Sequence, residues 1–156
     1  MSGVFSPPWN PEVQFLFGIL LALLFSGTAL SAGPGPQSSG NLPPCPDSPN
    51  CVSSQAPDAA HRVDPILIAE DPAASWSRLV EGIGKMKGAR IVEEGDGYLH
   101  AEFRSAVFGF VDDVEFRMDS AGKRIDLRSA SRKGTYDFGA NRRRVEEIRA
   151  RFSREP

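Results

Sequence analysis

The chain has 156 residues, and its 18 lysines and arginines nearly balance its 20 aspartates and glutamates, for a formal net charge of −2. This balance argues against nucleic-acid binding, which depends on a strongly basic surface. Two histidines and two cysteines leave few ligands for a metal site. We therefore expect one modest domain with an appendage, and no nucleic-acid partner, metal or cofactor.

The N-terminal part differs in composition from the rest. Residues 1–61 contain no lysine or arginine but ten of the 13 prolines. Within this part, residues 13–32 form an almost unbroken apolar run without charge, long enough to span a membrane. The run predicts a signal peptide or an N-terminal membrane anchor over residues 1–32.

Both alternatives for this segment stay open. Ala29 and Ser31 are small enough for a cleavage site, but the usual basic residues before the apolar run are missing. In either case we expect the folded part to be exported, and to be periplasmic or anchored to the membrane facing the periplasm.

A linker rich in Gly, Pro and Ser is expected over residues 33–44, followed by a single α+β domain over residues 45–156. Cys45 and Cys51 lie at the start of this domain, in a segment with two prolines. Behind an export-like leader, this spacing predicts a local disulfide. The alternatives are free thiols, or half of a zinc site completed by His61 and His100.

The folded part begins with a short edge strand, expected over residues 63–68 because Pro65 cannot donate within a sheet. Asp71 followed by Pro72 then predicts the start of a helix, and Gly88 its end. This helix carries an apolar stripe at helical spacing: Trp76, Leu79, Val80, Ile83 and Met86.

Four strands are expected next, over residues 89–94 and 98–104 and then in a hairpin that turns at residues 120–123. The alternation of residues 110–119 indicates one buried face. Keeping the apolar faces together pairs Met118 with Ile125 and Phe116 with Leu127. The same register sets two acid–base pairs opposite each other: Glu115 with Arg128, and Arg117 with Asp126.

Asp137 predicts the cap of a last helix over residues 138–152, whose inward stripe is Asn141, Val145, Ile148 and Phe152. The expected fold is therefore α+β. It has an antiparallel sheet of four or five strands, with one helix before it and one helix after it, preceded by the apolar signal or anchor segment.

Several motifs occur in a specific order: CPDSPNC at residues 45–51, YLHAEF at 98–103, FVDDVEF at 110–116, RSASR at 128–132 and NRRR at 141–144. On these motifs, residues 42–152 resemble the domain-of-unknown-function family 1499. The resemblance implies a small domain of bacteria and plant plastids, often behind a signal or anchor. It carries no established activity and therefore assigns no catalytic residue.

Four polar residues fall at inward positions of this scheme: Asp112, Ser129, Ser131 and Asn141. A buried carboxylate without a partner is costly, so Asp112 needs one, and Arg132 or Arg144 can supply it. Three interpretations stay open: a structural cluster that fastens the last helix to the sheet, a ligand pocket, or a catalytic site.

The opposite face of the sheet is expected to be a solvated charge ladder or a polar partner surface. Its outward residues are Glu102, Arg104, Asp113, Glu115, Arg117, Asp126 and Arg128. His100 lies on this outward parity and is expected to be solvated. This position argues against a nucleophilic pair between His100 and Ser129 or Ser131.

The segment 132–154 holds eight basic and three acidic residues, which suits contact with phosphates, anionic lipid or a polar partner. We therefore predict an exported or membrane-anchored envelope module that is not catalytic. It would bind a partner, lipid or small anion, with a membrane surface or an envelope protein as its partner. The alternative is a small envelope enzyme that uses the polar cluster around Asp112.

Overall fold

The structure is a computed structural model that describes residues 40–69, 71–121 and 123–154. The expected signal or anchor segment over residues 1–32, and most of the linker, lie outside these residues. In the part of the chain that is described, no helix is both long and apolar enough to cross a membrane.

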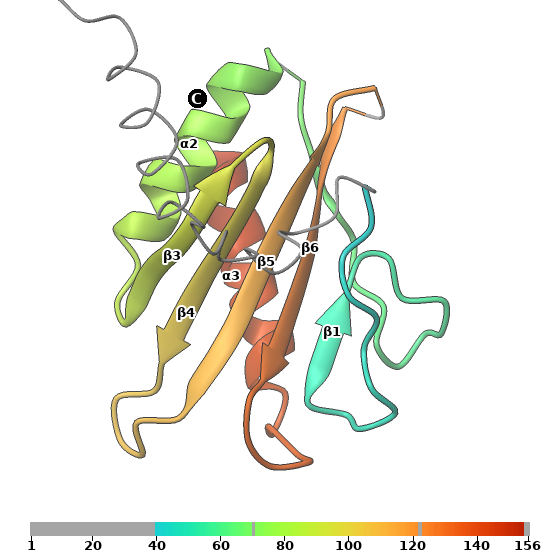
Figure 1. The fold of residues 1–156 in the computed structure, drawn as a ribbon, viewed down its shortest axis with the longest axis vertical. Coiled ribbons are helices and arrows are strands. Elements are labelled where there is room, and N and C mark those ends of the chain that lie inside the picture. The colour runs from blue at the N-terminus through green and yellow to red at the C-terminus, as the bar shows by residue number, and fades with distance from the viewer. Residues whose placement is uncertain (1–39, 70, 122, 155–156) are drawn as a thin grey trace, which may run out of the picture. The chain divides into compact units, whose positions relative to one another are not determined.

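The described residues form one antiparallel sheet covered on one face by two helices, as expected for an α+β fold (Figure 1). The helices are α2 (Pro72–Gly84) and α3 (Ala140–Arg154). Strand order is β1-β6-β5-β4-β3, and β2 also pairs with β6. The strands are β1 (Cys51–Ser53), β2 (Ile66–Leu67), β3 (Ala89–Gly95), β4 (Tyr98–Arg104), β5 (Val111–Asp119) and β6 (Arg124–Ser131).

The sheet has six strands in the described residues rather than the expected four or five. The extra strand is β1, in which Cys51 pairs with Ala130 and Val52 with Ser129. Three residues are too few to show an alternating pattern. The strand forms because its backbone hydrogen-bonds to the edge of β6. It therefore cannot be predicted from the local sequence.

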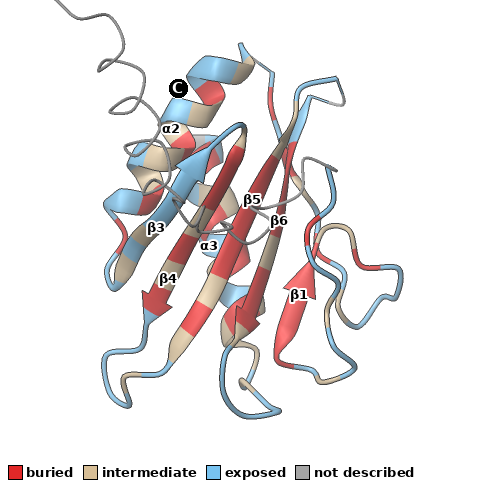
Figure 2. Ribbon diagram, viewed as in Figure 1, coloured by how far each residue is buried: buried red, intermediate tan, exposed pale blue. Residues whose placement is uncertain are grey.

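The expected register of the central hairpin is confirmed. Met118 pairs with Ile125 and Phe116 with Leu127, and both acid–base pairs lie opposite each other. Val114, Phe116, Ile125 and Leu127 are completely buried, and Figure 2 shows the buried residues running along β4, β5 and β6. The alternation also places Phe110 on the buried face, and this is wrong, because Phe110 lies just before β5 and is 55% exposed.

Asp71 caps α2 as expected, because its carboxylate accepts from the backbone N–H groups of Ala73 and Ala74 at 2.9 and 3.0 Å. The helix ends at Gly84 and not at Gly88. Gly88 serves another purpose: its φ is +79°, and a Cβ there would lie 2.6 Å from the carbonyl oxygen of Arg104. Only glycine permits this close approach to β4.

The last helix begins at Ala140, two residues later than expected. Phe138 and Gly139 have φ values of +53° and +76°. This left-handed conformation is incompatible with a right-handed α-helix, so the helix begins only after Gly139. Asp137 still caps the helix, since its carboxylate accepts from the backbone N–H groups of Gly139 and Asn141 at 2.9 and 2.8 Å. The inward stripe of the helix is buried as expected.

Cys45 and Cys51 are joined by a disulfide, with their Cα atoms 5.6 Å apart. The bond uses both sulfurs, which removes the thiolates that a zinc site would need. His61, the other residue considered for such a site, instead contacts the carboxylate of Asp58 at 2.9 Å.

Candidate functional site

Asp112 lies on the helix-covered face of β5, and α3 provides its partner. The Nη2 of Arg144 donates to Oδ2 of Asp112 at 2.6 Å. The guanidinium carbon of Arg144 also lies 5.1 Å from the centre of the Phe103 ring, in a cation–π arrangement. The carboxylate is therefore neutralised across the interface between sheet and helix. This confirms the expectation that Asp112 has an arginine partner, and the partner is Arg144.

Asn141 is the fully buried centre of the same cluster. Its side-chain oxygen accepts from Ser129 Oγ at 2.6 Å and from Arg144 Nη1 at 2.7 Å. Its side-chain nitrogen lies 2.9 Å from the carbonyl of Asn50 and 3.0 Å from Ser131 Oγ. One amide thus connects α3 to β6 and to the segment before β1. We call the following residues the Asp112 cluster: Asp112, Ser129, Ser131, Asn141, Arg144 and Asn50.

The structure brings together five of the six residues that the sequence proposed for this site: Asp112, Ser129, Ser131, Asn141 and Arg144. Arg132 is not among them. It follows Ser131 by one residue, so its side chain points to the opposite face of the sheet. Asn50 joins the cluster without any sequence signal, because it precedes β1 in an irregular segment.

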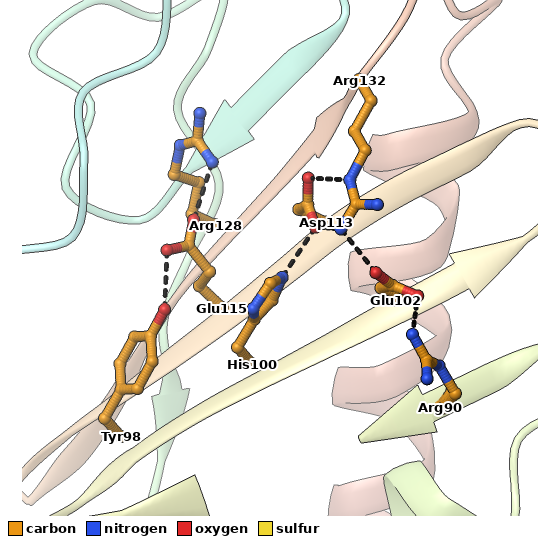
Figure 3. Close-up of polar contacts among 8 residues, drawn as sticks. All are labelled: Arg90, Tyr98, His100, Glu102, Asp113, Glu115, Arg128 and Arg132. Carbon is orange, nitrogen blue, oxygen red and sulfur yellow. Dashed lines mark hydrogen bonds and ion pairs between the residues drawn. The ribbon is translucent and has the colours of Figure 1, made fainter. Parts of the chain in front are cut away.

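On that opposite face Arg132 links two carboxylates (Figure 3). Its Nε and Nη2 donate to the two oxygens of Asp113 at 2.8 and 2.7 Å, and Nη2 also lies 2.6 Å from Glu102. Burial alone would raise the pKa of Asp113, but hydrogen bonds from Arg132 and His100 outweigh it and hold that pKa below its ordinary value. Hydrogen bonds from Arg90 and then Arg132 lower the pKa of Glu102.

A second group on this face is centred on Glu115 (Figure 3). Its carboxylate accepts from the Tyr98 hydroxyl at 2.9 Å and from Arg128 Nη1 at 2.7 Å. Burial, followed by the charge of Glu115, raises the pKa of the Tyr98 phenol. The phenol therefore stays protonated and acts as a donor.

The expectation of a solvated charge ladder on this face is wrong for Glu115, Arg117 and Asp126, which are buried. Asp126 is buried because Ser54 and Gln55, which follow β1, donate to its carboxylate at 2.8 and 3.1 Å. His100 is half-buried, and its Nε2 lies 2.7 Å from Asp113. Most of these charges are paired with an opposite charge, whereas the guanidinium carbon of Arg117 lies 4.8 Å from the centre of the Tyr98 ring.

A different situation exists beside the Asp112 cluster, in a groove of about 440 Å³ between α3, the end of β4 and the segment after α2. We call it the basic groove. Its charged lining consists of Lys87, Arg104, Arg143, Arg144, Arg151 and Glu147. Two of the five cations are neutralised, since Arg144 pairs with Asp112 and Arg151 with Glu147 at 2.8 Å.

The other three cations of the groove have no carboxylate partner within the described residues. Arg104 donates to the carbonyl of Gly109 at 3.2 Å, and Arg143 donates to the carbonyl of Phe138 at 2.7 Å. Lys87 is exposed at the groove wall. Arg104 follows the inward-facing Phe103 on β4, so its guanidinium points to the opposite face of the sheet. Lys87 and Arg143 therefore leave two cations without a carboxylate partner at this concave surface, which favours an anion there.

Residues 41–152 match the family model described as Protein of unknown function (DUF1499). The chain belongs to this family. The resemblance inferred from the ordered motifs is thereby confirmed. No curated protein and no solved structure matches the chain.

In this DUF1499 domain, the Asp112 cluster does not place a serine hydroxyl beside the His100 imidazole. The Ser129 hydroxyl donates to Asn141 and accepts from Arg144 at 3.0 Å, and the imidazole of His100 lies on the other face of the sheet. A serine nucleophile needs a neighbouring base, and no hydrogen bond joins Ser129 to a histidine or carboxylate among residues 40–69, 71–121 and 123–154. The basic groove instead offers donors for an anion, of which sequence reasoning named only Arg144 as a site residue.

Proposed function

We propose that this DUF1499 protein is a non-catalytic module of the cell envelope that binds a small anion in the basic groove. The observation that carries the proposal is the pair of cations, Lys87 and Arg143, that line the groove without a carboxylate partner among the described residues. Guanidinium and ammonium donors of this kind recognise phosphate and carboxylate groups. The ligand class is therefore an anion with such a group.

The closed state of the Asp112 cluster supports a binding role over a catalytic one. The Asp112 carboxylate is paired with Arg144, and Asn141 uses both its oxygen and its nitrogen in hydrogen bonds. Buried polar networks that are satisfied in this way rigidify a fold. We infer that the cluster holds α3 in place and so keeps Arg143 and Arg144 at the wall of the groove.

Two features support the envelope location. Residues 13–32 have the length and composition of a signal peptide or membrane anchor. The disulfide between Cys45 and Cys51 suits an oxidising compartment outside the cytoplasm. In our proposal the module is exported, and is either free in the periplasm or anchored to the membrane facing it.

Calorimetric titration of the full chain in detergent with inorganic phosphate tests the proposed binding. We expect saturable binding that Arg143→Gln weakens about tenfold or more, because a hydrogen bond to a charged group contributes roughly 1.5–3 kcal/mol. Lys87→Gln should also weaken binding. Titration with glycerol phosphate, a soluble lipid headgroup, distinguishes a lipid-derived anion from free phosphate by which of the two binds more tightly.

The matched control is Arg149→Gln, which makes the same change on the same helix. Arg149 pairs with Glu146 at 2.8 Å and does not line the groove. It should leave phosphate binding unchanged. Equal losses for Arg143→Gln and Arg149→Gln, or no phosphate binding by the parent chain, would overturn the proposed function.

A further inference from the structure

Two loops at one end of the sheet carry a concentration of exposed aromatic residues. They are residues 105–110, between β4 and β5, and residues 132–139, between β6 and α3 (Figure 1). Five of the seven large hydrophobic residues that are exposed in the described chain lie there: Val107, Phe108, Phe110, Tyr136 and Phe138. We call these two segments the aromatic loops. Scattered apolar residues need no explanation, but a cluster at one end indicates an interaction site.

The aromatic rings are held in defined positions. Phe108 and Phe110 stack with ring centres 5.7 Å apart, and Tyr136 and Phe138 meet edge to face at 5.0 Å. The first loop is closed by two bonds between Ser105 and Phe110, at 2.8 and 3.0 Å. Little conformational freedom is therefore left to lose on binding.

The backbone at Phe138 points to the same conclusion. Its φ of +53° is unfavourable for a bulky side chain, and it leaves the ring 79% exposed. The residue is held by Arg143, which donates to its carbonyl at 2.7 Å. Strain of this kind persists where the surrounding structure imposes it, which is often at functional positions.

Within the aromatic loops themselves, the cations Arg132 and Lys133 outnumber the acidic residue Asp137. Arg104 precedes the first loop, Lys133 lies within the second and Arg143 lies directly behind it. The one acidic residue of the two segments is Asp137, whose carboxylate caps α3. Exposed aromatic rings beside lysine and arginine fit a lipid bilayer surface, because rings settle at headgroup level and cations are drawn to anionic lipid.

We propose that the aromatic loops dock onto the surface of an anionic lipid bilayer, with Phe108 and Phe138 inserted at the level of the headgroups. The inference rests on the envelope location in the proposed function. It does not depend on anion binding in the basic groove. The proposed partner is a lipid surface, because the loops present exposed aromatic side chains and not a groove that could hold a peptide.

The test places a fluorescent reporter in the loops of the full chain. Phe108→Trp and Phe138→Trp are each mixed with vesicles of phosphatidylcholine and phosphatidylglycerol that contain brominated phosphatidylcholine, a quencher within the bilayer. The parent chain is measured in parallel to subtract the signals of Trp9 and Trp76. The readout is local to the introduced side chain, so insertion of residues 13–32 does not produce it.

Leu67→Trp is the matched control. Leu67 and Phe108 are both 75% exposed, but Leu67 pairs with Arg124 at the hairpin end of β6, opposite to the aromatic loops. We expect quenching of both loop reporters to be several-fold stronger than that of Leu67→Trp. Vesicles of phosphatidylcholine alone, or the additional change Lys133→Glu, should remove most of this difference.

Equal quenching at all three positions, or none at the loops, would overturn the proposal. The proposal would also fail if brominated lipid does not quench the loop reporters but an envelope protein shields them from solvent. That result would indicate a protein partner. Failure of the proposed function is distinguishable. Phosphate titration of Phe138→Trp tests the groove when docking fails, and Phe108→Trp combined with Lys87→Gln tests docking when the groove is disabled.

Discussion

Asp112 and Asp113 are adjacent, chemically identical and oppositely placed. Asp112 is 7% exposed and accepts a hydrogen bond from Arg144 on the helix side of the sheet. Asp113 is hydrogen-bonded to Arg132 and His100 on the open face. The parity of the strand predicted which aspartate faces inward. It did not predict that Asp113 would also be well paired, because its partners come from two other strand segments.

This difference leads to a prediction on stability. Asp112→Ala should cost on the order of 1–3 kcal/mol of unfolding free energy, because it removes the carboxylate partner of Arg144, whose side chain is only 16% exposed. Asp113→Ala should cost about 1 kcal/mol or less, because Arg132 is 43% exposed and can return to water. Chemical denaturation of both variants measures the two costs, and the reverse order would contradict our assignment of Asp112 as the structural anchor.

Element by element, periodicity was most informative where an element is long and has one buried face. The alternation of β5 and β6 predicted the hairpin register, and Asp71 with Pro72 predicted the start of α2. Prediction failed where contacts distant in sequence decide. Examples are β1, which exists through its pairing with β6, and the start of α3, where two left-handed residues delay the helix.

Glycines at α2 and just after it offer a matched test of these elements. Gly88→Ala should destabilise the protein, because φ is +79° and the new Cβ would lie 2.6 Å from the carbonyl oxygen of Arg104. Gly82→Ala lies inside α2 with no atom within 4 Å of the added Cβ, so it should stabilise by about 0.5–1 kcal/mol. Thermal unfolding measures both, and stabilisation by Gly88→Ala would contradict the described approach of β4.

At the scale of the whole molecule, the charges separate into two kinds of surface. On the open face of the sheet most carboxylates pair with cations, whereas the basic groove keeps Lys87 and Arg143 without a carboxylate partner among the described residues. Lys87 and Arg143 come from two segments that only the fold brings together. No spacing in the sequence relates them, so the Asp112 cluster could be predicted largely from parity and the groove could not.

The central claim is that an anion binds in the basic groove. Its most direct test is to record backbone amide chemical shifts of the ¹⁵N-labelled full chain in detergent during titration with inorganic phosphate. We predict that the largest shifts fall at Lys87 and Arg143, with little change at His100 and Arg132. Largest shifts on the open face of the sheet, or no shifts at saturating phosphate, would contradict the claim.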